Sequence, residues 1–100
     1  MSQQETKTSE TSKEISAYIR KELTARNKTA QDVAEAMNRS YTFAYVRVQG
    51  IKSFTIDELD NIATLIGINS VYELIAASRE YAYQQLRGIS TWSEITNSPQ

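Results

Sequence analysis

The side chains that most enzymes use for nucleophilic attack or zinc binding are missing from this chain, which has no histidine and no cysteine among its 100 residues. Without them, Ser-His-Asp and Cys-His arrangements and the usual zinc sites cannot form. The three glycines are too scattered for a phosphate-cradling loop. The neighbouring carboxylates Asp57, Glu58 and Asp60 are typical of a solvated helix start. We therefore expect no enzymatic activity, no metal and no cofactor.

The basic residues offer a different chemistry, because seven of them lie between positions 20 and 52, against three acidic ones. This stretch carries a local charge of +4, whereas six acidic and two basic residues from position 53 onward give −4. Such asymmetry indicates that one half of the chain meets a polyanion, with ordinary surface charge as the alternative. The seven residues are Arg20, Lys21, Arg26, Lys28, Arg39, Arg47 and Lys52.

Length and composition limit the framework that positions these residues to one small domain. Apolar residues make up 40% of the chain, enough for one core, and no apolar run is long enough to cross a membrane. The polar start MSQQETKTSETSK is unlike a secretory signal, and the lack of cysteine is consistent with a reducing compartment. We expect a soluble cytoplasmic protein with no membrane partner and no small-molecule ligand.

A serine or threonine followed three residues later by an acidic residue marks a helix start, because both side chains can satisfy free backbone N–H groups. Together with apolar spacing, such pairs predict helices over about 13–26, 30–37, 56–66 and 70–87. The pairs are Thr11/Glu14, Thr29/Asp32, Thr55/Glu58, Ser70/Glu73 and Thr91/Glu94.

These boundaries divide the chain into three parts. Residues 1–11 are polar and predicted to be disordered, and residues 12–87 form the helical domain. Gly88 is expected to end the last long helix. Residues 88–100 then form a C-terminal tail, in which Ile89, Trp92 and Ile95 have the spacing of a short helix after Thr91.

The segment MNRSYTFAYVRVQG, residues 37–50, fits two structures. Its alternating aromatic and β-branched residues favour a strand. Its apolar residues also recur every three or four positions, which is one face of a helix. A strand pair among four helices would be marginally stable, whereas a helix over about 41–49 completes the domain. We therefore predict an all-α fold, a compact bundle of about five helices.

Two short helices joined by a turn of about three residues form a helix-turn-helix, whose second helix enters the DNA major groove. Ala34 supplies the small residue that close packing of the two helices needs. Asn38 tolerates positive φ at the corner, and Ser40 can cap the next helix. The pattern predicts a helix-turn-helix over about 30–49.

The stretch TAQDVAEAMNRSYTFAYVRVQGIKSFTIDELDNIATLIGI resembles the lambda-repressor-like (Cro/CI, XRE) DNA-binding domain of phage and bacterial regulators. The match covers about residues 14–76 without a gap. Arg39 and Arg47 occupy positions that are often apolar in this family, so either the third helix is rotated or the arginine stem passes the core. A glutamine is usual where this chain has Ala30, and a glycine where it has Asn38. The matching positions are Val33-Ala34, Met37, Asn38, Ser40, Gly50 and LDNIATLIG.

The resemblance implies that Tyr41 and Thr42, with Val46 one turn further on, face base edges. Thr42 and Val46 could each contact a thymine methyl group. Tyr41 and Tyr45 could instead belong partly to the core, and Phe43 could pack against the preceding helix.

Phosphate contacts are expected from residues around the third helix. By position in the family these are Gln49 and Lys52, and by charge Arg39 and Arg47. Side chains at the start of the second helix are further candidates. The full expected DNA-binding set is Thr29, Gln31, Arg39, Ser40, Tyr41, Thr42, Phe43, Tyr45, Val46, Arg47, Gln49 and Lys52.

The resemblance implies a sequence-specific, double-stranded DNA-binding transcriptional regulator, a phage-type repressor that occludes promoters in a bacterial or infected cell. A homodimer through the fifth helix and the C-terminal tail would suit operators with two half-sites. One alternative is an antitoxin of a toxin–antitoxin pair with the same fold. Another is a helical protein-interaction adaptor, although such an adaptor has no need for Arg39, Arg47 and Lys52 around the third helix.

Overall fold

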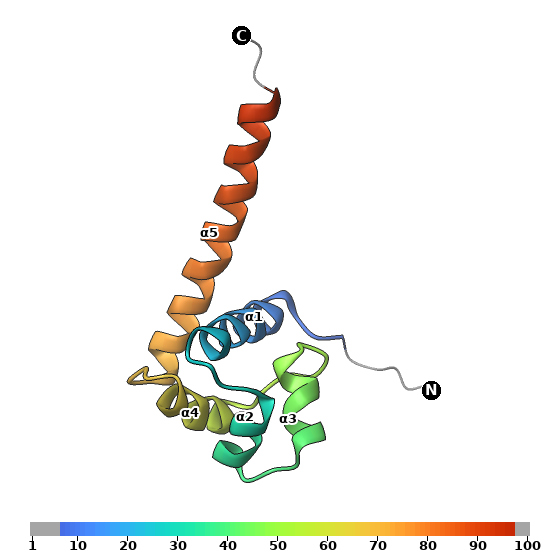
Figure 1. The fold of residues 1–100 in the computed structure, drawn as a ribbon, viewed down its shortest axis with the longest axis vertical. Coiled ribbons are helices and arrows are strands. Elements are labelled where there is room, and N and C mark those ends of the chain that lie inside the picture. The colour runs from blue at the N-terminus through green and yellow to red at the C-terminus, as the bar shows by residue number, and fades with distance from the viewer. Residues whose placement is uncertain (1–6, 98–100) are drawn as a thin grey trace.

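The computed structural model describes residues 7–97, which form five α-helices and no strand (Figure 1). The all-helical prediction is therefore confirmed, and the ambiguous segment is a helix. The remaining parts of the two predicted tails, residues 1–6 and 98–100, lie outside the described residues. The helices are α1 (Glu10–Ala25), α2 (Ala30–Met37), α3 (Tyr41–Val48), α4 (Ile56–Leu65) and α5 (Val71–Asn97).

Short polar side chains set where most helices begin, as the capping pairs predict. At α2 and α4 the threonine hydroxyl accepts a backbone N–H while the acidic residue accepts the N–H of that threonine. At α5 the serine hydroxyl accepts a backbone N–H. The three pairs are Thr29/Asp32, Thr55/Glu58 and Ser70/Glu73.

Helix α1 begins earlier than predicted. The hydroxyl of Ser9, and not that of Thr11, accepts the first free N–H, from Ser12 at 3.0 Å. Thr11 consequently lies inside the helix. The prediction of disorder over residues 1–11 is therefore wrong for its last two residues, which are helical.

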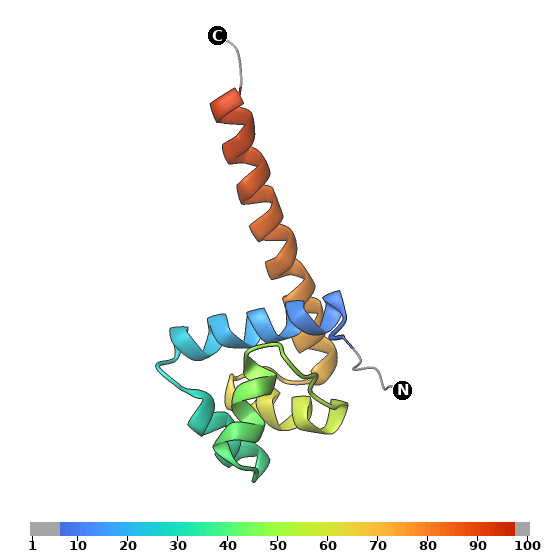
Figure 2. The same ribbon diagram turned by 90° about the vertical axis from the view of Figure 1, so that its right-hand side faces the viewer.

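The core receives fully buried side chains from every helix, for example Ile19, Val33, Ala44, Ile62 and Leu74. Helix α1 packs against α3 and α5, while α2 packs against α3 and α4. Figure 2 shows α1 crossing above the other short helices, with α3 beneath it. Helix α3 is therefore held by α1 and α2, and part of the surface of α3 that faces neither helix is exposed.

Helix α5 is longer than predicted, because it continues through Gly88 and Thr91 to Asn97. A glycine inside a helix costs only about 1 kcal/mol, so it need not end one. The predicted end at residue 87 and the predicted start at Thr91 are both wrong. Figures 1 and 2 show the C-terminal part of α5 projecting beyond the other helices. In the described part of the chain, none of the helices is both long and apolar enough to span a membrane.

Candidate nucleic-acid interface

The connection between α2 and α3 is a turn of three residues, 38–40. Asn38 adopts the left-handed conformation (φ 57°, ψ 48°), which ends α2 and which asparagine accepts more readily than most residues. The backbone N–H of Arg39 then donates to the carbonyl of Ala34 at 2.9 Å. Ser40 begins α3, because its hydroxyl accepts the backbone N–H of Phe43 at 3.1 Å. Local hydrogen bonds thus fix where each helix stops and starts.

Two small apolar residues turn one side of α3 toward the core. Ala44 and Val48 are buried and lie four residues apart, so they share one face of the helix. Ala34 of α2 is also buried. Small side chains at both sites allow the two helices to approach closely.

A row of polar side chains from α1 and from the chain just before it anchors the C-terminal end of α3 and the loop after it. The row consists of Thr8, Ser12, Ser16 and Arg20, and we call it the α1 polar stripe. Ser12, Ser16 and Arg20 lie four residues apart on one side of α1, and Thr8 precedes the helix. Three of the four bond backbone carbonyls at or after the end of α3, and Ser12 bonds a serine hydroxyl in the loop. The bonds are Thr8 Oγ1 to the Ile51 carbonyl (2.9 Å), Ser12 Oγ to Ser53 Oγ (2.9 Å), Ser16 Oγ to the Arg47 carbonyl (2.8 Å) and Arg20 Nη1 to the Val48 carbonyl (2.7 Å).

Gly50 follows the end of α3 in a conformation that favours glycine. Its φ of +83° is strained for residues with a side chain. The helix predicted over about 41–49 is observed as α3, which ends at Val48 with Gln49 as its cap.

The surface of α3 that faces away from the core is formed by Tyr41, Thr42, Tyr45, Val46 and Gln49, which we call the exposed α3 face. Tyr41 is 50% and Tyr45 42% exposed, so neither belongs to the core. Their rings stack with centroids 5.7 Å apart. Thr42 and Gln49 are exposed and Val46 is half-buried. Both tyrosines also line a pocket of about 270 Å³ that includes Arg20, Lys28 and Thr29.

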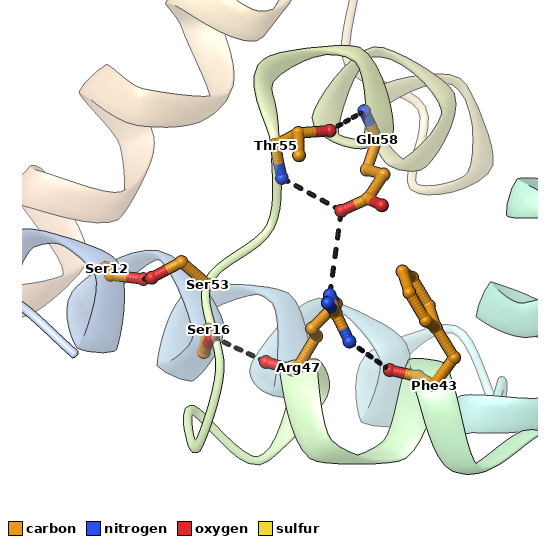
Figure 3. A network of polar contacts seen from close by, with 7 residues as sticks. All are labelled: Ser12, Ser16, Phe43, Arg47, Ser53, Thr55 and Glu58. Carbon is orange, nitrogen blue, oxygen red and sulfur yellow. Dashed lines mark hydrogen bonds and ion pairs between the residues drawn. The ribbon is translucent and has the colours of Figure 1, made fainter. Parts of the chain in front are cut away.

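Arg47 lies on the flank of α3 and is held within the fold (Figure 3). Its Nη1 donates to the Phe43 carbonyl at 3.1 Å, and its Nε lies 3.8 Å from Glu58 Oε1. The second distance is an ion-pair contact but too long for a hydrogen bond. The Arg47 side chain is only 18% exposed. Since Thr55 N–H donates to the same Glu58 oxygen at 2.8 Å, the start of α4 fixes the carboxylate that faces Arg47.

Phe43 connects this ion pair to the turn before α3. The Cζ of Arg47 lies 3.5 Å from the ring centroid of Phe43, and the Cζ of Arg39 lies 3.8 Å from it. Two planar guanidinium groups so close to one ring would overlap on a single face, so they stack on opposite faces. Such contacts contribute about 0.5–1 kcal/mol at exposed sites. Phe43 therefore packs on the flank of α3, while Arg39 remains exposed.

The remaining predicted site residues lie around the edge of α3. The backbone of Thr29 donates to Asp32 Oδ2 in the capping box of α2, and the Thr29 hydroxyl accepts Gln31 N–H at 3.2 Å. The Gln31 side chain donates to Glu35 along α2. Lys52 is exposed in the loop after α3. The structure thus places Thr29 in the pocket lined by both tyrosines and Lys52 in the loop after the C-terminal end of α3.

Sequence reasoning did not identify two residues that hold α3 in place, Ser16 and Glu58. Ser16 is fully buried between apolar neighbours, and the spacing of four shared with Thr8, Ser12 and Arg20 is the signal that marks it. The sequence marks Glu58 only as part of a helix start. Its second contact, to Arg47, joins different helices and has no local signature.

Comparison of the chain with protein-family models, with curated proteins and with solved structures finds no match.

Proposed function

We propose that α2, the turn 38–40 and α3 form a helix-turn-helix, and that the protein is a sequence-specific regulator of transcription that binds double-stranded DNA. The observation that carries this proposal is the anchoring of α3. It is fixed by α1, α2 and the start of α4, yet it exposes a continuous face of uncharged side chains.

The dimensions of α3 support insertion into DNA. A helix with its side chains is about 10–12 Å wide, and the major groove is about 12 Å wide. Tyr41, Thr42 and Val46 on the exposed α3 face would then meet base edges. Gln49, at the C-terminal end of α3, would contact phosphate.

Cationic and polar groups around α3 supply contacts to the DNA backbone in this proposal. Lys52 is exposed beyond the C-terminal end of α3, and Arg39 is exposed before its N-terminal end. Lys28 and Thr29 border the tyrosine pocket at the start of α2. We call Lys28, Arg39 and Lys52 the rim cations. Binding by them would exclude other proteins from a promoter, which is how such a regulator represses.

Helix α5 gives the protein a second surface. Beyond the packed part of α5, Tyr83 and Leu86 are exposed apolar side chains. Self-association through this part of the helix would present two copies of α3 to one operator. An antitoxin would instead use the same surface for its toxin, and an adaptor would use α3 itself for a protein partner.

The first test is selection of bound sequences from random duplex DNA, for the wild type and for Thr42→Ala, at two salt concentrations. We expect an enriched motif, altered at one position by Thr42→Ala, and an affinity that falls as salt rises because bound phosphates release counterions. Thr64→Ala is the matched control, because Thr64 is an exposed threonine on α4. Weak binding without an enriched motif contradicts the proposal, and so does an identical change in the Thr64→Ala selection.

A further inference from the structure

The exposed α3 face has an unusual chemical composition for a surface that would read DNA. Its five residues are two tyrosines, a threonine, a valine and a glutamine, so it carries no ionised side chain. Arg39 and Arg47 stack on Phe43 at the flank of the helix, and Arg20 of α1 donates to the Val48 carbonyl. Arg47 is further held by the Phe43 carbonyl and by Glu58.

Each base offers a different group in the major groove, and side chains differ in which of them they can bind. Arginine and lysine bind the two acceptors of guanine, whereas asparagine and glutamine bind adenine. Apolar atoms contact the 5-methyl group of thymine. On the exposed α3 face, only Gln49 can make a bidentate contact, and it caps the C-terminal end of the helix. Guanine therefore has no bidentate partner on this face.

Thr42 and Val46 are the two residues of the exposed α3 face whose side chains carry methyl groups. Thr42 is exposed and Val46 is half-buried. They lie four residues apart on α3, which places them on the same side of the helix about 6 Å apart along its axis. Base pairs are stacked about 3.4 Å apart. The two methyl-bearing side chains can therefore meet neighbouring or next-neighbouring base pairs of one half-site.

We propose that α3 reads its DNA site chiefly through the 5-methyl groups of thymine, contacted by Val46 and Thr42, and that the centre of each half-site is thymine-rich without a required guanine. This inference rests on the proposed function. The inference adds to the proposed function the chemical group that is recognised and the two residues that recognise this group.

The test replaces thymines one at a time by deoxyuridine in the duplex enriched by the wild-type protein. Deoxyuridine lacks only the methyl group and keeps the same base pairing. Loss of one buried methyl contact should weaken binding about three- to five-fold at each thymine beneath α3. Thymines outside the enriched motif serve as internal controls and should show no change.

Variants assign each methyl group to a side chain. Val46→Ala should bind more weakly and should no longer respond to deoxyuridine at one of the sensitive positions. Thr42→Ser, which keeps the hydroxyl but removes the methyl group, should do the same at another. Ile56→Ala is the control, since Ile56 is an exposed apolar residue on α4 and should leave every deoxyuridine effect unchanged.

The outcomes separate this inference from the proposed function. Absence of any enriched motif overturns both. An enriched motif that tolerates deoxyuridine everywhere overturns thymine-methyl recognition while leaving DNA binding intact. So does a motif that requires guanine and loses this requirement in Arg39→Gln or Arg47→Gln, because the flanking arginines would then be the readers.

Discussion

Arg47 is a mostly buried charged residue on α3, and three contacts account for its presence there. Its planar group covers one face of Phe43, bonds the Phe43 carbonyl and faces the carboxylate of Glu58. Arginine suits such a site better than lysine because it stacks and donates in fixed directions. Helix α3 therefore accommodates a charge near the core while Ala44 and Val48 face inward.

Replacing Glu58 by glutamine tests the contribution of this charge pair. The introduced amide can still complete the capping box, so helix α4 should keep its start. Arg47 would lose its counter-charge while only 18% exposed, and we expect the free energy of unfolding to fall by about 1 kcal/mol. Chemical denaturation of Glu58→Gln and of Asp60→Asn, an exposed carboxylate on the same helix, provides the comparison. Equal effects of the two variants would show that the ion pair does not stabilise the fold.

The pH dependence of stability should report on Glu22. Burial raises its pKa, but the hydrogen bond and charge of Lys21, with hydrogen bonds from Arg26 and Tyr18, outweigh that effect, so the pKa of Glu22 is lowered. A lowered pKa in the folded protein means that the stabilisation is complete above the usual glutamate range and is lost as the pH falls through the folded-state pKa. Glu22→Gln should thus be less stable than wild type by about 0.5–1 kcal/mol at neutral pH.

That difference should disappear in acid, when Glu22 is protonated in both states of the wild type. Urea denaturation at several pH values between neutral and strongly acidic measures it. Glu35→Gln is the control, since the Glu35 carboxylate contacts Gln31 within α2. A wild-type advantage that persists below the titration of Glu22 contradicts this assignment.

At the scale of the helices, the side chains of the α1 polar stripe fix the end of α3. Ser16 is fully buried, and its hydroxyl joins α1 to the carbonyl of Arg47. Ser16→Ala should lower the free energy of unfolding by about 1 kcal/mol. It should also weaken DNA binding, because α3 would be held less firmly.

Ser78 provides a matched control for Ser16. It is equally buried, but its hydroxyl bonds the carbonyl of Leu74 in its own helix. Ser78→Ala should leave DNA affinity unchanged, because no second helix is released. Thermal unfolding and DNA titration of both variants test this difference. Equal losses of DNA affinity in the two variants would refute a specific role of the stripe.

The bounds of α2 and α3 could be predicted because local side chains mark them. Thr29 and Ser40 cap the starts, and Asn38 adopts the left-handed turn between them. The start of α1 could not be predicted, because Ser9 and Thr11 are both suitable caps. Thr8 and Ser12, on either side of Ser9, donate hydrogen bonds to the loop after α3. These bonds form only in the folded structure, so the sequence does not show that Ser9 is the cap.

Side-chain environments were harder to predict than helix bounds. The exposure of Tyr41 and Tyr45 could not be derived from spacing, because both flank the buried positions of α3. The Phe43 ring packs between the guanidinium groups of Arg39 and Arg47. Arg47 in turn contacts Glu58 on the next helix. The contact between Arg47 and Glu58 joins two helices, so the sequence around Phe43 does not show how Arg47 is fixed.

At the scale of the whole molecule, α5 divides into a part that packs on α1 and a part that projects. Tyr81 lies against Tyr18, with ring centroids 6.1 Å apart, whereas Leu86 is 62% exposed. We expect the projecting part to pair with a second copy of the chain. Leu86→Lys should then convert dimers to monomers without lowering the melting temperature of the domain.

Sedimentation velocity over a range of protein concentrations measures this association. Tyr72→Lys is the control, since Tyr72 is 86% exposed on the first turn of the same helix, within the packed part. It should leave the association unchanged. A wild-type protein that stays monomeric at every concentration would rule out pairing through α5 and favour a different partner for this surface.

The uncharged character of the exposed α3 face has a consequence for selectivity. If the rim cations meet phosphates in specific and non-specific complexes alike, added salt weakens both by the same factor. The ratio between the two affinities then depends on methyl groups and on hydrogen bonds, neither of which releases counterions. Ionic strength would therefore change how many DNA molecules are occupied but not which sequences are preferred.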